Sequence, residues 1–306
     1  MESVALFLSA SVNAGTVLAL AALGLVVNER AGVVNLGAEG MMLVGALAGY
    51  VTAFHTHSLA LGFAAGVAAG AVLAVGFGFL VIWLGTNQYA TGLALSLFGG
   101  GFAAFAGTAY TGRQLPAQAP FRLDGLAELP FVGPALFRYH PTVYLAIALC
   151  GGLAWLFYRT RPGLVLRAVG EAPEAAHALG HPVRRIRLAA VVFGGALCGL
   201  AGAYVSLVYT RLWVEGLVAG RGWIALALTT FATWRPGRVI LGAYLFGGVT
   251  MLQFRLQAEG VQIESHLLAM APYLATILVL VLISRKPARI RLHMPASLGK
   301  DFRPDP

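Results

Sequence analysis

Charged residues are scarce in this chain. Only 11% of its 306 residues are Asp, Glu, Lys or Arg, and 58% are hydrophobic, whereas soluble domains carry about 25% charged residues. This lack of charge excludes an ordinary soluble domain. What the chain has instead is a series of apolar runs of about 17 to 25 residues, the length that crosses the hydrocarbon core of a bilayer. The composition therefore predicts an all-α polytopic membrane protein that is embedded in a lipid bilayer.

Cysteine is nearly absent, and the residues of metal and catalytic sites do not cluster. Cys150 and Cys198 each lie inside an apolar run, which predicts neither a disulfide nor a metal site. The seven histidines are scattered without metal-ligand spacing, and we find no Ser/His/Asp or paired-carboxylate pattern. The P-loop pattern GxxxxGK[ST] does not occur. We therefore expect no catalytic, cofactor-binding or metal-binding residue in this chain, and a membrane-embedded enzyme is a distant alternative.

Acidic residues are also few, with 12 against 21 basic ones and a net charge of +9. Twelve of the basic residues fall in two places, Arg159–Arg187 and Arg285–Arg303. Basic loops of membrane proteins stay in the cytoplasm, so topology explains the positive charge and no nucleic-acid partner is expected. The charges predict that both segments and the turn 235–238 are cytoplasmic. The mixed-charge loop 111–140 and the N-terminus are then external.

The apolar runs predict about nine transmembrane helices, with about eight or ten as alternatives because two runs are short enough to be re-entrant. The expected spans are Ser3–Val27, Gly40–Phe54, Leu59–Leu84, Leu93–Tyr110, Pro141–Phe157, Leu188–Thr210, Trp223–Trp234, Val239–Phe254 and Leu267–Ile283. We expect one transmembrane domain over 1–306, made of a first half (1–135), a linking span (136–158), a cytoplasmic loop (159–187), a second half (188–284) and a cytoplasmic tail (285–306).

The two halves repeat the same rhythm in opposite directions. Each has a long span, a polar glycine-containing break and then a short span, at Asn28–Phe54 and at Arg211–Trp234. In transporters with inverted repeats, such broken segments at matching positions point to the translocation path, because irregular backbone at membrane depth is tolerated only inside protein or beside a watery cavity. The predicted path residues are Asn35, Gly37, Glu39, Asn87, Gln88, Thr91, Glu215, Gly220, Arg221 and Trp223.

Other interpretations of these polar residues stay open. The amides and hydroxyls can serve helix–helix hydrogen bonding alone. Glu29 and Arg30 can form a local interfacial ion pair, which contributes little, or a structural latch near a gate. Tryptophan is enriched at membrane interfaces, which favours an interfacial position for Trp213, Trp223 and Trp234, although Trp223 can also stack on a nucleobase.

The basic loop contains a short predicted helix. Glu171, Pro173 and Glu174 suit a first helical turn, residues 175–179 continue it, and Gly180 ends it. A defined helix between two spans suggests a docking surface for a cytoplasmic partner. An ordinary solvated loop is the alternative.

Three motifs carry a family resemblance. They are ERAGVVNLGAEGMMLVGA (29–46), LRAVGEAPEAAHALG (166–180) and GRGWIALALTTFATWRPG (220–237), in this order. The chain resembles, over about 25–285, the permease subunits of bacterial ABC importers. It is most similar to the nucleoside-uptake branch of the branched-chain amino acid and simple-sugar permease family. The resemblance implies a type II ABC importer-like permease in two inverted halves, located in the bacterial inner membrane.

The resemblance also implies partners and a solute. We expect a second permease subunit, homologous or identical, a cytoplasmic ABC ATPase that binds ATP and Mg²⁺, and an extracytoplasmic solute-binding protein. The expected solute is a nucleoside or purine base, with a simple sugar or a branched-chain amino acid as alternatives. By the same resemblance, the residues that couple the permease to the ATPase are Gly170, Glu171, Pro173, Glu174, Ala175, Ala176, Leu179 and Gly180.

Overall fold

The structure is a computed structural model that describes residues 2–116, 139–258, 270, 274, 277, 278, 281 and 294–303. The described chain is helical, and its one β-type contact is an isolated bridge between Gln114 and Leu212. Within these residues, six helices are long and apolar enough to cross a membrane. The predicted span Leu267–Ile283 and most of the loop 111–140 lie outside the described residues, so the predicted number of about nine spans stays a prediction.

The helices follow the predicted spans closely. Their bounds are α1 (Glu2–Arg30), α2 (Ala38–Thr56), α3 (Leu59–Gly78) with a π-helical extension (Phe79–Trp83), α4 (Gln88–Gly107) with a 3₁₀ turn (Thr108–Tyr110), α6 (Pro141–Arg159), α7 (Arg161–Glu171), α8 (Pro173–Ala178), α9 (Val183–Tyr204) with a π-helical extension (Val205–Tyr209), α10 (Arg221–Phe231) and α11 (Pro236–Ala258).

Local sequence explains several helix starts. The Ser58 hydroxyl accepts a hydrogen bond from the Leu61 amide at 3.4 Å, and the Asn87 side chain accepts from the Tyr89 and Ala90 amides at 3.0 Å. Thr160 caps α7 in the same way, and Pro162 suits its first turn. These side chains satisfy backbone N–H groups that have no partner inside the helix.

Two predicted boundaries were wrong for the same reason. α1 does not end at Val27 but continues through Asn28 and Glu29 to Arg30, and α4 begins at Gln88, so that Thr91 is helical. Polar side chains were expected to break these helices. They lie inside the protein instead, where the helix satisfies the backbone and other elements supply partners for most of the side chains.

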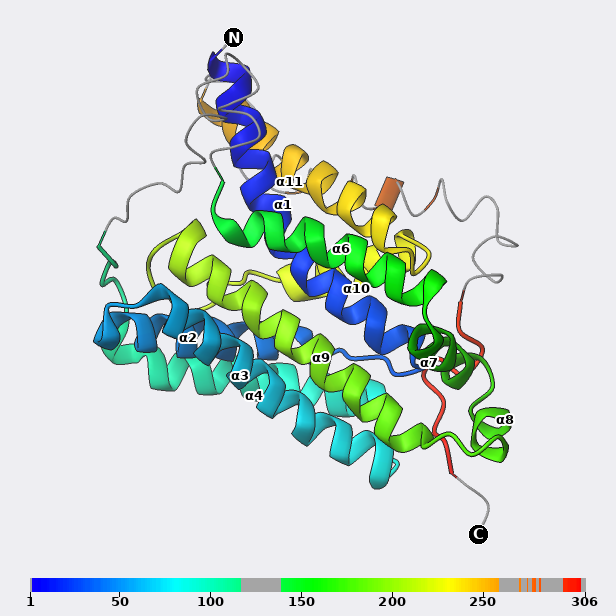
Figure 1. The fold of residues 1–306 in the computed structure, drawn as a ribbon. Helices are drawn as coiled ribbons and strands as arrows, with labels where there is room; N and C mark the ends of the chain where they lie inside the picture. Colours follow the sequence, from blue (N-terminus) through cyan, green and yellow to red (C-terminus); the bar gives the residue numbers. More distant parts are fainter. Residues whose placement is uncertain are drawn as a thin grey trace.

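The long helix of each half packs against the other half. α1 packs on α11 and α10, and α9 packs on α3 and α2 (Figure 1). Gly32, just after α1, lies beside Arg187 in the first turns of α9, so the two helices run in opposite directions. This reciprocal packing is the arrangement expected of two inverted halves.

Small residues allow the close crossings. A Cβ on Gly15 of α1 would lie 2.7 Å from the Ala243 oxygen of α11. A Cβ on Gly199 of α9 would meet the Gly66 oxygen of α3, and Gly24 and Gly194 meet where α1 crosses α9. Glycines at such positions bring helix backbones together in membrane proteins.

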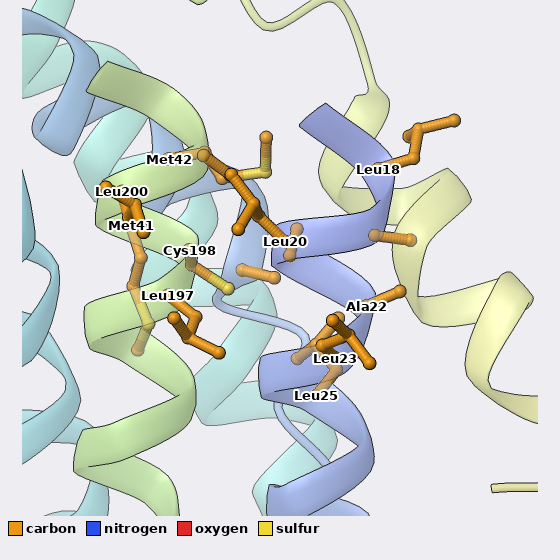
Figure 2. Packing of buried hydrophobic residues seen from close by; sticks show 14 of the residues in the cluster. Leu18, Leu20, Ala22, Leu23, Leu25, Met41, Met42, Leu197, Cys198 and Leu200 are labelled. Carbon is orange, nitrogen blue, oxygen red and sulfur yellow. The ribbon is translucent and has the colours of Figure 1, made fainter. Parts of the chain in front are cut away.

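The core lies between α1 and α9. The most apolar window of α1 is 83% buried and that of α9 72%, against 22–39% for the other long helices. Figure 2 shows Leu20, Met42, Leu197 and Cys198 filling the space between α1, α2 and α9. The outer helices expose apolar side chains such as Phe105, as expected for helices that contact lipid.

Two of the three tryptophans that were predicted to mark membrane interfaces are buried in the protein, and their depth in the membrane stays a prediction. Trp213 and Trp234 are 1% and 2% exposed and belong to the core, whereas Trp223 is 37% exposed. The contacts of each buried indole could not be predicted from the sequence. Trp213 packs against Gly107 at the end of α4, and Trp234 binds a side chain of α1.

Different segments of the chain meet at the two ends of the bundle. At one end, the segment after α4 pairs with the segment after α9, through hydrogen bonds from Gly112 N to Trp213 O (3.1 Å) and from Leu115 N to Arg211 O (3.0 Å). At the other end lie the end of α1, α7, α8, Arg235 and residues 294–303. The basic segments therefore share one end, as the predicted topology requires.

Candidate functional site

The two broken segments meet at Glu39. This residue lies in the first turn of α2, and its carboxylate accepts hydrogen bonds from the amides of Gly220 (2.8 Å) and Gly222 (2.6 Å) at the start of α10. A helix N-terminus favours an anion because its first N–H groups are unpaired and its dipole is positive. Glu39 therefore connects the short helices of the two halves at their N-termini.

Glycine is required on the α10 side of this contact. Gly220 has φ +78°, in the left-handed region that other residues rarely adopt. A Cβ on Gly222 would lie 2.6 Å from the Cα of Glu39, so a side chain there would push α2 and α10 apart. The contact we name the Glu39 junction consists of Glu39, Gly220 and Gly222.

Asn35 and Gly37 shape the chain before α2. The Asn35 side chain is fully buried, and its oxygen accepts from the Gly37 amide at 2.9 Å. A Cβ on Gly37 would lie 2.8 Å from a methyl group of Leu95 in α4. These two predicted path residues thus stabilise the turn that orients the Glu39 side chain toward α10.

The other predicted residues of the second half flank the junction. The Arg221 guanidinium donates to the Leu217 and Val218 oxygens at 3.1 Å, stacks over Tyr209 and interacts electrostatically with Glu39. Glu215 is exposed in the turn that precedes Gly220. Trp223 is exposed in the first turn of α10.

The three predicted residues near α4 lie elsewhere. Asn87 caps α4, and Thr91 donates to the Thr86 hydroxyl at 2.9 Å. Gln88 is buried, accepts from the Val34 amide at 2.8 Å and donates to the Lys300 oxygen at 3.4 Å. The hydrogen bonds of these side chains, as far as the structure describes them, do not reach the Glu39 junction.

A second polar contact joins the halves at the end of α1. The Glu29 carboxylate accepts from the Thr229 hydroxyl at 2.9 Å and from the Trp234 indole N–H. Arg30 donates to the Trp234 oxygen at 3.2 Å. No sequence spacing points to these contacts, because Thr229 and Trp234 lie 200 and 205 positions from Glu29.

The helix predicted in the basic loop is shorter than expected. Glu171 was assigned to its first turn, but Glu171 is the last residue of α7, and α8 begins at Pro173. Gly170, in the last turn of α7, lies in close contact with the Arg30 oxygen, and Glu171 accepts from the Ala296 amide at 3.2 Å. The break between the two helices falls at Ala172, because proline disfavours helical backbone in the residue before it.

α8 has one buried and one exposed face. Ala176 is 3% exposed and packs in a small apolar cluster with Val169, Val183 and Phe302. Glu174 and Ala175 are exposed, and Leu179, which follows the helix, is 79% exposed. Gly180 has φ +85° and turns the chain away. The helix therefore presents a mixed apolar and acidic face to the outside of the bundle.

The described part of the chain contains no group of three or more His, Cys, Asp or Glu residues that could hold a metal ion. Among the described side chains, the Glu39 junction and α8 are sites of contact between elements. Neither combines a nucleophile with a base.

Comparison with known proteins identifies the type of protein. Residues 7–283 match the family described as "Branched-chain amino acid transport system / permease component". The chain is 42% identical to the "Putative glucose ABC transporter permease protein TsgC13" of Haloferax volcanii, over 99% of this chain and 98% of the relative. No solved structure matches the chain.

Two further relatives transport nucleosides according to their names. The chain is 31% identical to the guanosine ABC transporter permease protein NupQ of Bacillus subtilis, over 92% of this chain and 93% of the relative. It is also 31% identical to the nucleoside ABC transporter permease protein NupC of Lactococcus lactis subsp. cremoris, over 87% and 88%. These relatives are transport subunits, which removes the alternative of a membrane-embedded enzyme. The chain therefore belongs to the family of branched-chain amino acid transport system permease components, and it is a multi-pass membrane permease subunit of an ABC transporter.

Proposed function

We propose that this permease carries a nucleoside into the cell and that the solute passes beside the Glu39 junction. The observation that carries the proposal is that Glu39 joins the N-termini of the two broken segments. In inverted-repeat transporters the solute site lies where such segments meet. A junction held by a few hydrogen bonds between two halves can open when the halves move apart.

A neutral, hydroxyl-bearing solute suits this junction. The Glu39 charge is already bound by two amide N–H groups and lies near Arg221, so no excess charge is left there to require an ion as solute. When the halves separate at the junction, the Gly220 and Gly222 amides that Glu39 now binds become free to hydrogen-bond ribose hydroxyls or a base edge. The relatives named for guanosine and nucleoside transport support this class.

Glucose is a second candidate. It is favoured by the relative at 42% identity, whose name includes glucose. A hexose and a ribose ring offer similar hydroxyl groups, so the junction by itself does not discriminate between them. A direct transport measurement decides between glucose and a nucleoside as the solute.

Members of this family work with an ATPase and a solute-binding protein. We place the ATPase at α8, where Glu174, Ala175 and Leu179 form an exposed face at the basic end of the bundle. The solute-binding protein then docks at the opposite end, near the segments that follow α4 and α9. A second permease subunit, homologous or identical, completes the path.

The test is uptake by proteoliposomes that contain the whole importer, purified with its ATPase and its solute-binding protein. We expect ATP-dependent accumulation of labelled guanosine that excess unlabelled adenosine reduces and glucose does not. Accumulation of labelled glucose alone would favour the second candidate. Failure of this chain to co-purify with an ATPase would contradict the proposal that an ATPase docks at α8.

A further inference from the structure

Residues 294–303, which we call the C-terminal segment, pack across the basic end of the bundle. The Ser297 amide and hydroxyl both donate to the Gly170 oxygen, at 3.0 and 2.6 Å, at the end of α7. The Gly299 amide donates to the Gly32 oxygen at 3.2 Å, in the turn after α1. The segment therefore bonds to the helix that precedes α8 and to the turn that leads toward Glu39.

Buried side chains hold the same segment from α9 and α4. Arg187 of α9, which is 2% exposed, donates to the Ser297 hydroxyl at 2.9 Å and to the Lys300 oxygen at 3.2 Å. Gln88 of α4 donates to that Lys300 oxygen and accepts from the Val34 amide. Gln88 thus joins the C-terminal segment to the break after α1.

Phe302 gives the segment its contact with α8. Its ring is 9% exposed and lies in the apolar cluster with Val169, Ala176 and Val183. It also contacts the His177 ring at 5.7 Å between centroids. α8 has only six residues and is too short to be stable alone. Its buried face therefore depends on Phe302 for a large part of its apolar contact.

We propose that the C-terminal segment transmits movement of α8 to the break after α1 and so couples ATP hydrolysis to opening of the path. This inference rests on the proposed docking of the ATPase at α8. The segment touches α8 through Phe302 and the break through Gly32 and, by way of Gln88, Val34. In this structure it is a noncovalent link between the two, and it lies beside the direct contact of Gly170 in α7 with the turn at Arg30 and Gly32. Ser297, Phe302 and Arg187 are positioning residues in this account.

If the C-terminal segment only stabilised the fold, a different result would be expected. A tail that only stabilises the fold would, when weakened, lower ATP hydrolysis and transport together. A transmitting segment would, when weakened, leave ATP hydrolysis intact and lower the transport obtained from it. The ratio of solute moved to ATP hydrolysed separates the two.

The variant Phe302→Ala tests the inference in the complete importer, reconstituted in proteoliposomes and assayed with labelled guanosine and, in a second arm, labelled glucose. We expect the ATPase to co-purify and its basal rate to stay at the wild-type value. We expect solute moved per ATP to fall about tenfold, a usual size for a coupling between sites. Phe302→Leu, which keeps an apolar side chain in the cluster, should restore most of the ratio.

Met294→Ala is the matched control. It removes a large apolar side chain from the same segment, but Met294 is 43% exposed, so the ratio should not change. An equal loss in Met294→Ala and Phe302→Ala would overturn the inference, as would loss of the ATPase from the Phe302→Ala complex.

A second measurement does not depend on the solute. Hydrogen exchange of the permease–ATPase complex, with and without ATP and vanadate, reports whether amides 31–37 respond to the ATPase. We expect a response in the wild type and in Met294→Ala, and a response about tenfold weaker in Phe302→Ala. Equal responses in the wild type and Phe302→Ala would overturn this inference alone. The absence of any response in the wild type would overturn the proposed function and this inference with it.

Discussion

At the scale of single residues, the described acidic side chains inside the bundle bind groups of the other half. Glu29 binds Thr229 and Trp234, and Glu39 binds the amides of Gly220 and Gly222. A charge at the bilayer centre costs about 2.5 to 3.5 kcal/mol when no such partner is present. These contacts therefore stabilise the assembled halves and would cost energy wherever the halves separate.

Replacing Glu39 tests the junction directly. Glu39→Gln keeps the size of the side chain, but the amide nitrogen cannot accept a hydrogen bond, so one of the two N–H groups loses its acceptor. We expect a loss of about 1.5 to 3 kcal/mol from the junction, the usual contribution of a hydrogen bond to a charged group. The melting temperature of the detergent-solubilised protein should fall, and guanosine uptake should change. Glu215→Gln, at an exposed position in the turn that precedes Gly220, is the control, and an equal effect there would contradict the role of Glu39.

At the scale of elements, α8 is a small helix with an exposed acidic and apolar face. We expect Glu174→Arg and Gly180→Pro to leave the protein in the membrane but to uncouple it. The first reverses the exposed charge, and the second forces a φ near −65° where the chain requires +85°. ATP hydrolysis by the reconstituted importer should no longer respond to the loaded binding protein. A normal response in both α8 variants would remove this helix from the coupling role.

The crossing of α3 and α9 is buried, in contrast to the exposed face of α8, and it depends on close backbone contact. Gly199→Leu places a side chain where the Gly66 backbone already lies. Overpacking of this kind typically costs about 1 to 3 kcal/mol and more when backbone must move, so we expect little folded protein in the membrane. Gly151→Leu in α6 makes the same change where no atom lies within 4 Å. Size-exclusion profiles of the two fluorescently tagged variants should differ, and matching profiles would contradict the crossing.

At the scale of the whole molecule, the two ends of the bundle should face opposite sides of the membrane. In a background without Cys150 and Cys198, Ala175→Cys should react with a membrane-impermeant thiol reagent only from the cytoplasmic side. Thr111→Cys should react only from outside. Both positions are exposed in the structure. Labelling of both from one side would refute the predicted topology.

The sequence by itself determined the class of protein and most of its elements. Low charge and long apolar runs require a membrane, and the placement of basic residues sets the sides. The starts of α3 and α6 at Leu59 and Pro141 follow the predicted positions, because Ser58 and Pro141 act on backbone within one turn. The glycine-broken segments also marked, without any structure, the region where Glu39 lies.

Only the tertiary structure decided which distant groups meet. The partners of Glu29 and Glu39 lie 181 to 205 positions away, and no periodicity relates them. The same holds for the burial of Trp213 and Trp234 and for the contacts of the C-terminal segment, which composition describes only as a basic tail. Hydrophobicity acts through the average of many residues and can be read along the chain. A hydrogen bond or a close glycine contact depends on two backbones arriving at one place, and this position is fixed by the packing of all the helices together.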